Sequence, residues 1–122
     1  MSEKTVLIVE AYADVRALMK FLVRRYGYTV IEAADGYEAV EQTKEHCLDL
    51  ILMDISMPLM DGLEATRIIR TLKGYCNTPI IALTAHDKAF YQRAIHAGCD
   101  EVIGKPLDFD VLEDLLKRHT SD

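Results

Sequence analysis

A short apolar run of strand length occurs five times in the chain, and each run is followed by a longer amphipathic stretch. The runs are rich in β-branched residues, as strands are, and they cover residues 6–9, 29–31, 50–53, 80–83 and 102–103. Between them, apolar side chains recur at helical spacing, most clearly over residues 15–26 and 63–72. This alternation predicts an α/β fold in which helices cover both faces of a parallel sheet.

Residues with special turn chemistry lie where the predicted helices begin and end. Gly27, Gly74 and Gly98 each follow an amphipathic stretch, as a left-handed glycine follows a helix. Asp35 stands three residues before Glu38, as in a capping box at a helix N-terminus. No linker or low-complexity segment interrupts the pattern, so residues 1–122 are predicted to form a single domain.

Charge and hydropathy restrict the partners. The formal net charge of -6 argues against direct binding of nucleic acid, which requires clustered Lys and Arg. No apolar run is long enough to span a membrane, and the N-terminus lacks the layout of a signal peptide. We therefore expect a cytoplasmic protein. The three cysteines are far apart and odd in number, which predicts reduced thiols and neither a disulfide nor a metal framework.

Four polar residues follow four of the predicted strands. They are Glu10, Asp54, Thr84 and Lys105, each at the carboxyl end of its strand. In open parallel sheets, ligands bind in the crevice beyond these ends. Although the four residues are far apart in sequence, we expect them to converge at one edge of the sheet.

Each of the four also has an ordinary structural explanation. Asp54 could cap the turn after its strand, and Thr84 with Asp87 fits a capping box. Glu10 could be a surface acid, and Lys105 could belong to an ordinary loop. In either case we expect Lys105 to face solvent and to contribute little to folding. These separate structural roles explain the four residues less well as a set, because two acids, a hydroxyl and an ammonium are chemically complementary.

Together these groups suit phosphoryl transfer to Asp54. A carboxylate is the nucleophile in aspartyl-phosphate chemistry. Mg²⁺ held by Glu10, Asp54 and a backbone carbonyl, that of Ser56, would neutralise charge on the transferring group. Lys105 and the hydroxyl of Thr84 would bind the remaining phosphoryl oxygens.

At these residues the chain resembles the receiver domain of response regulators, the phospho-acceptor of two-component signalling. The motifs are the apolar strand ending at Glu10, the segment 53–62 (MDISMPLMDG), Leu83-Thr84-Ala85 and Lys105-Pro106. The resemblance implies a flavodoxin-like, doubly wound fold with five helices and a parallel sheet in the order 2-1-3-4-5. It also implies phosphoryl transfer to Asp54 from a phosphohistidine of a sensor histidine kinase or histidine phosphotransfer domain, and signalling to a downstream effector or output domain.

Two positions depart from the family pattern. Receivers usually have two successive acids after the first strand, whereas Glu10 is followed here by Ala11. The missing acid is the more direct Mg²⁺ ligand in the family, so we expect weakened magnesium affinity. Three residues before Lys105, Val102 replaces the aromatic residue that usually moves with the switching Thr.

Two functions therefore stay open. One is a receiver phosphorylated on Asp54, and the other is a pseudo-receiver, an interaction module that is not phosphorylated because Ala11 replaces a ligand. Turnover of an external substrate is not expected. Aspartyl-nucleophile phosphatases need a second Asp two residues after the first, where this chain has Ser56, and no glycine-rich nucleotide motif occurs.

Overall fold

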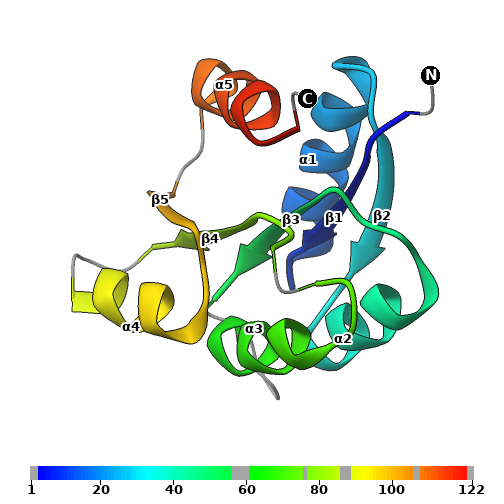
Figure 1. Ribbon diagram of the computed structural model, residues 1–122. Coiled ribbons are helices and arrows are strands. Elements are labelled where there is room, and N and C mark those ends of the chain that lie inside the picture. Colours follow the sequence, from blue (N-terminus) through cyan, green and yellow to red (C-terminus); the bar gives the residue numbers. More distant parts are fainter. Residues whose placement is uncertain (1–2, 56–60, 76, 86–88, 106–107, 121–122) are drawn as a thin grey trace.

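A computed structural model describes residues 3–55, 61–75, 77–85, 89–105 and 108–120. Within these ranges, five strands form one parallel sheet in the order β2-β1-β3-β4-β5 (Figure 1). The strands are β1 (Thr5–Val9), β2 (Thr29–Ala33), β3 (Leu50–Asp54), β4 (Ile80–Thr84) and β5 (Glu101–Gly104). The parallel α/β sheet predicted from the alternation, and the strand order implied by the resemblance, are both confirmed.

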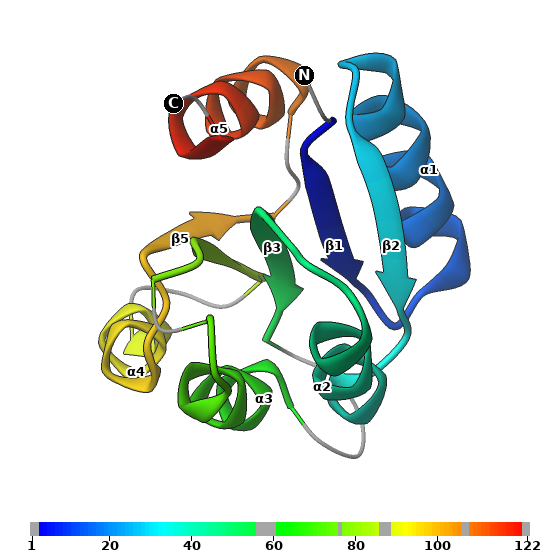
Figure 2. The ribbon, with the colours of Figure 1, turned by 45° about the vertical axis from the view of Figure 1, so that its right-hand side comes forward.

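Helices cover both faces of this sheet. In Figures 1 and 2, α1 and α5 lie on one face, and α2, α3 and α4 lie on the other. The helices are α1 (Ala13–Arg25), α2 (Gly36–Glu45), α3 (Gly62–Thr71), α4 (Ala89–Ala97) and α5 (Phe109–Thr120). Each follows a strand, so each begins at the edge of the sheet where the strands end.

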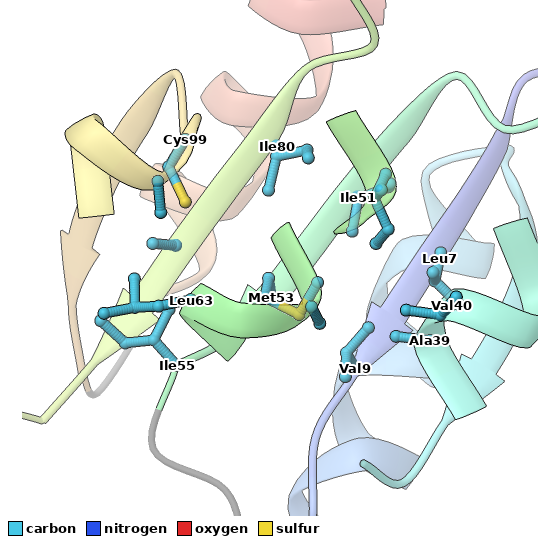
Figure 3. Packing of buried hydrophobic residues seen from close by; sticks show 14 of the residues in the cluster. Leu7, Val9, Ala39, Val40, Ile51, Met53, Ile55, Leu63, Ile80 and Cys99 are labelled. Atoms are coloured by element: carbon cyan, nitrogen blue, oxygen red, sulfur yellow. The ribbon is translucent and has the colours of Figure 1, made fainter. Parts of the chain in front are cut away.

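Two apolar cores result from the alternation of side chains along the central strands. In β3, Ile51 and Met53 point into the core beneath α2, α3 and α4 (Figure 3), whereas Leu50 and Leu52 point into the core beneath α1 and α5. All of these side chains are fully buried. The continuous apolar run of the central strands therefore reflects burial on both faces of the sheet.

The predicted helix ends are largely confirmed. Gly27, Gly74 and Gly98 have positive φ angles of 97°, 90° and 118°, which favour glycine. The Asp35 carboxylate accepts a hydrogen bond of 2.8 Å from the backbone N–H of Glu38. In return, Glu38 accepts from Ala34 N, not from Asp35 N as in a standard capping box.

The register brings the strand ends to one edge. Val9 of β1 is paired with Met53 of β3, and Thr84 of β4 is paired with Gly104 of β5. The residues that follow Val9, Met53 and Gly104 are Glu10, Asp54 and Lys105. The sheet therefore places these three residues and Thr84 along a single edge.

Gly62, the first residue of α3, lies directly against this edge. A Cβ atom at Gly62 would lie 2.6 Å from the Cα of Ile55, and closer still to the carbonyl oxygen of Asp54. Both neighbours are backbone atoms, which cannot rotate away as a side chain could. The lack of a side chain at Gly62 thus allows α3 to begin beside Asp54.

We expect Gly62→Ala to lower the free energy of unfolding by about 1 to 3 kcal/mol, because the added methyl group overpacks the backbone of β3. Gly104→Ala is the matched control. A Cβ at Gly104 would meet no described atom within 4 Å, so this variant should stay within about 0.5 kcal/mol of the wild type. Urea denaturation measures both, and equal stability of the two variants would contradict the close contact.

Candidate functional site

Lys105 joins two carboxylates that come from two other strands. Its ammonium donates hydrogen bonds to Glu10 Oε1 at 2.9 Å and to Asp54 Oδ2 at 3.1 Å. Glu10 follows β1, Asp54 ends β3, and Lys105 follows β5. Three of the four residues that the sequence predicted to converge therefore form one ion-paired cluster.

The two carboxylates of this cluster are buried. Glu10 and Asp54 expose only 1% and 2% of their side chains. A buried carboxylate is costly unless it is paired with a cation and hydrogen-bonded. An ordinary surface acid at position 10 is thus excluded, and neither carboxylate resembles a simple turn cap.

The expectation that Lys105 faces solvent is wrong. Only 25% of its side chain is exposed, because it extends toward the two carboxylates. Partial burial lowers the pKa of Lys105, but the hydrogen bonds to Glu10 and Asp54 outweigh burial and leave the pKa above its ordinary value. The ammonium is therefore charged at neutral pH. Its contribution to stability is lost only as the pH rises through this raised pKa.

Glu10 is also held by its own loop. Its second oxygen, Oε2, accepts a hydrogen bond of 3.1 Å from the backbone N–H of Tyr12. The guanidinium of Arg16 donates to the backbone carbonyl of Glu10 at 2.7 Å and to the carboxylate of Glu32 at 3.3 Å. Glu32 in turn pairs with Lys20, whose hydrogen bond lowers the pKa of the Glu32 carboxyl.

Arg16 was not among the residues predicted from the sequence. It lies one helical turn into α1, and its contact with Glu10 is with a backbone atom, which leaves no mark in the residue pattern. The sequence does contain a cation in the helix, Arg16, and an acid in the following strand, Glu32. Pairing these two opposite charges could have pointed to Arg16.

Of the remaining predicted residues, Thr84 directly contacts the main chain of Lys105. Thr84 is buried at the end of β4, and its backbone carbonyl accepts a hydrogen bond of 2.8 Å from Lys105 N. Ala11 and Val102 are partly buried and pack against the core beneath α2, α3 and α4. Ser56, proposed to contribute its carbonyl, and Asp87, the partner of Thr84 in the predicted capping box, lie outside the described residues.

The two carboxylates could also hold a hard cation. Mg²⁺ is commonly bound by one or two carboxylates together with waters and substrate phosphates, so Glu10 and Asp54 fit this ion in type and number. Among the described residues, no group of three or more His, Cys, Asp or Glu side chains could hold a metal. A metal at this edge would therefore depend on these two carboxylates, with water and backbone oxygens completing its shell.

Other predictions concern the rest of the chain. Cys47 is exposed and Cys99 is buried, and both are free thiols, whereas Cys76 is outside the described residues. Burial raises the pKa of the Cys99 thiol. In the part of the chain that the structure covers, no helix has the length and apolar character needed to cross a membrane.

Removal of the Lys105 charge should be costly. We expect Lys105→Met to lower the free energy of unfolding by roughly 2 to 4 kcal/mol, because it removes the ammonium that pairs with two buried carboxylates. Adding Glu10→Gln should restore part of the loss, since one buried charge is then gone. Urea denaturation at neutral pH provides the measurement.

Lys117→Met is the control, because the Lys117 side chain is 72% exposed and pairs with Glu113 on the surface. That variant should lose no more than about 0.5 kcal/mol. If the Lys105 and Lys117 variants were equally stable, the buried cluster would not have the energetic role assigned to it.

Comparison with known proteins identifies the family. The chain is 34% identical over 120 residues to the polar-differentiation response regulator DivK of Brucella abortus, and the alignment covers 98% of each of the two chains. It is 38% identical over 112 residues to the CAI-1 autoinducer sensor kinase/phosphatase CqsS of Vibrio cholerae, covering 90% of this chain but only 16% of that protein.

A solved structure matches the fold closely. The receiver domain of a sensor histidine kinase from Pseudomonas aeruginosa, crystallised with a magnesium ion coordinated in its active-site cleft, superimposes with a TM-score of 0.92. It is 32% identical and the match covers 99% of this chain and 100% of that one. The sequence model of the response regulator receiver domain matches residues 6–117. The chain therefore belongs to the response regulator receiver domain family of two-component systems.

Proposed function

We propose that this chain accepts a phosphoryl group on Asp54 from a phosphohistidine of a sensor histidine kinase or of a histidine phosphotransfer domain. The observation that carries the proposal is the buried cluster of Glu10, Lys105 and Asp54 at the carboxyl edge of the sheet. The similarity to a portion of a sensor kinase supports a kinase as donor, and the similarity to a response regulator of similar length supports a role in the same kind of signalling. The exchange is proposed to take place in the cytoplasm.

In the proposed reaction, a carboxylate oxygen of Asp54 attacks the phosphorus atom. The O–P bond forms as the P–N bond to the donor imidazole breaks, and the imidazole leaves. Lys105, 3.1 Å from Asp54 Oδ2, lies where its ammonium would stabilise the phosphoryl oxygens. The hydroxyl of Thr84 would bind another of these oxygens.

Mg²⁺ is the proposed cofactor. The similar receiver from Pseudomonas aeruginosa coordinates this ion in its cleft. In this chain, Glu10, Asp54 and the backbone carbonyl of Ser56 would be its ligands, and the bound ion would supply positive charge against the transferring phosphoryl group. Glu10 and Lys105 form an ion pair of 2.9 Å, so metal binding must displace or share that contact.

Phosphorylation is proposed to change the surface that α4, β5 and α5 present to a downstream effector or output domain. Val102 replaces the aromatic residue usual in receivers, so the change would depend on Thr84 and its loop. The protein acts here as a signalling phospho-acceptor that assists its own phosphorylation and dephosphorylation. It is not proposed to turn over an external substrate.

The second candidate is a pseudo-receiver that binds partners without being phosphorylated. Ala11 favours this alternative, because the site has two carboxylates where the family pattern provides three. Asp54, Thr84 and Lys105 favour phosphorylation, because all three groups required for phosphoryl binding are present. A direct phosphorylation assay separates the two functions.

We expect the wild type to gain one phosphoryl group when it is incubated with acetyl phosphate and Mg²⁺, as measured by intact mass. Asp54→Asn should abolish the adduct, whereas Asp110→Asn, at an exposed acid in the first turn of α5, should retain it. No adduct on the wild type, at any magnesium concentration, would favour the pseudo-receiver. An adduct that persists in Asp54→Asn would place the modification elsewhere.

Ala11→Asp should tighten Mg²⁺ binding by on the order of tenfold, or about 1.4 kcal/mol, because affinity for hard cations increases with the number of anionic ligands. The variant should also react faster with acetyl phosphate. Titration of Mg²⁺ into both proteins, followed by NMR, measures the difference. Equal or weaker binding by the variant would show that position 11 does not face the metal.

A further inference from the structure

One stripe along α1 consists of four exposed residues: Asp14, Leu18, Phe21 and Arg25. Their spacings of four, three and four residues place them on a single face of the helix, over about three turns. The stripe reads acid, apolar, apolar, base. None of the ion pairs within the described ranges includes Asp14 or Arg25, and the guanidinium of Arg25 lies 5.8 Å from the ring centroid of Phe21.

Exposed apolar side chains gather around this stripe. The structure describes seven exposed large hydrophobic residues, and five of them lie on α1, directly before it, or at the start of α5. Leu18 and Phe109 are 53% and 56% exposed. Between α1 and α5, which lie on the same face of the sheet (Figure 1), a groove of about 470 Å³ is lined by Leu18, Leu22 and Phe109. Contiguous exposed apolar surface of this kind marks an interaction site.

The stripe is symmetric about its midpoint. Leu18 and Phe21 lie equally far from the centre, and so do Asp14 and Arg25. Rotation by 180° about an axis perpendicular to α1 therefore exchanges the acidic end with the basic end. A surface with this property is complementary to itself, which is the requirement for a two-fold interface.

We infer that two copies of this chain associate through antiparallel α1 helices. Asp14 of each copy faces Arg25 of the other, and Leu18 of each faces Phe21 of the other. Phe109 and the groove beside it extend the apolar contact toward α5. The charges at the two ends fix the direction of packing, because parallel helices would place like charges together.

Sedimentation velocity of the wild type from about 10 µM to 1 mM tests the inference, over the range expected of a small, transient interface. We expect a concentration-dependent dimer. Leu18→Glu should raise the dissociation constant at least about tenfold, because it places two carboxylates in the apolar centre. Ile95→Glu is the matched control: Ile95 is 47% exposed on α4, away from the stripe, and its replacement should leave the dimer intact.

Charge reversal tests the antiparallel geometry. Asp14→Arg alone and Arg25→Glu alone should each weaken the dimer, because each creates two contacts between like charges. An equimolar mixture of the two variants should dimerise as well as the wild type, because both contacts in the mixed dimer again join opposite charges. Thermal unfolding followed by circular dichroism confirms that each variant is folded.

Three results would overturn the inference: a wild type that stays monomeric up to 1 mM, a Leu18→Glu variant that still dimerises, or a mixture that fails to restore association. If the monomeric wild type instead bound a histidine phosphotransfer domain and Leu18→Glu abolished that complex, the face would belong to the phosphodonor and the proposed self-association would be wrong.

Discussion

The ion pairs of Lys105 determine how the carboxyl edge of the sheet is organised. Two carboxylates are buried there, on neighbouring strands, and their mutual repulsion is offset by one ammonium. That ammonium belongs to the residue that follows the far edge strand, β5, so Lys105 reaches past the end of β4 to meet Asp54 and Glu10. The cluster thus links the ends of β1, β3 and β5, and it concentrates in one place the charges on which the proposed phosphoryl transfer would depend.

Much of the fold could be predicted because burial on both faces leaves a strong record in the sequence. The runs at 50–53 and 80–83 are continuous and apolar, and the observed strands extend each by a single residue, Asp54 or Thr84. The run at 102–103 is shorter than β5, since this edge strand is only partly buried and tolerates Glu101 and Gly104 at its ends. Convergence of Glu10, Asp54 and Lys105 followed from the rule that parallel strands end at one edge.

Features that depend on three-dimensional contacts could not be predicted. The burial of Lys105 depends on the direction of a long side chain, which has no periodicity. The support that Arg16 gives to Glu10 is a bond to a backbone carbonyl. Leu18 fits the helical apolar pattern but is exposed, because the apolar face of α1 is wider than the surface that contacts the sheet. The sequence records which residues are apolar, but the packing decides which of them are covered.

The contact between Gly62 and the end of β3 has a mechanical consequence. With no side chain between them, the first turn of α3 rests on the peptide that joins Asp54 to Ile55. Packed protein interiors have low compressibility, and the nearest described atoms here are backbone atoms, not a flexible side chain that could absorb a displacement. A shift of the Asp54 main chain by a few tenths of an ångström must therefore push the start of α3 or be resisted by it, so that the helix and the strand end respond as one stiff unit.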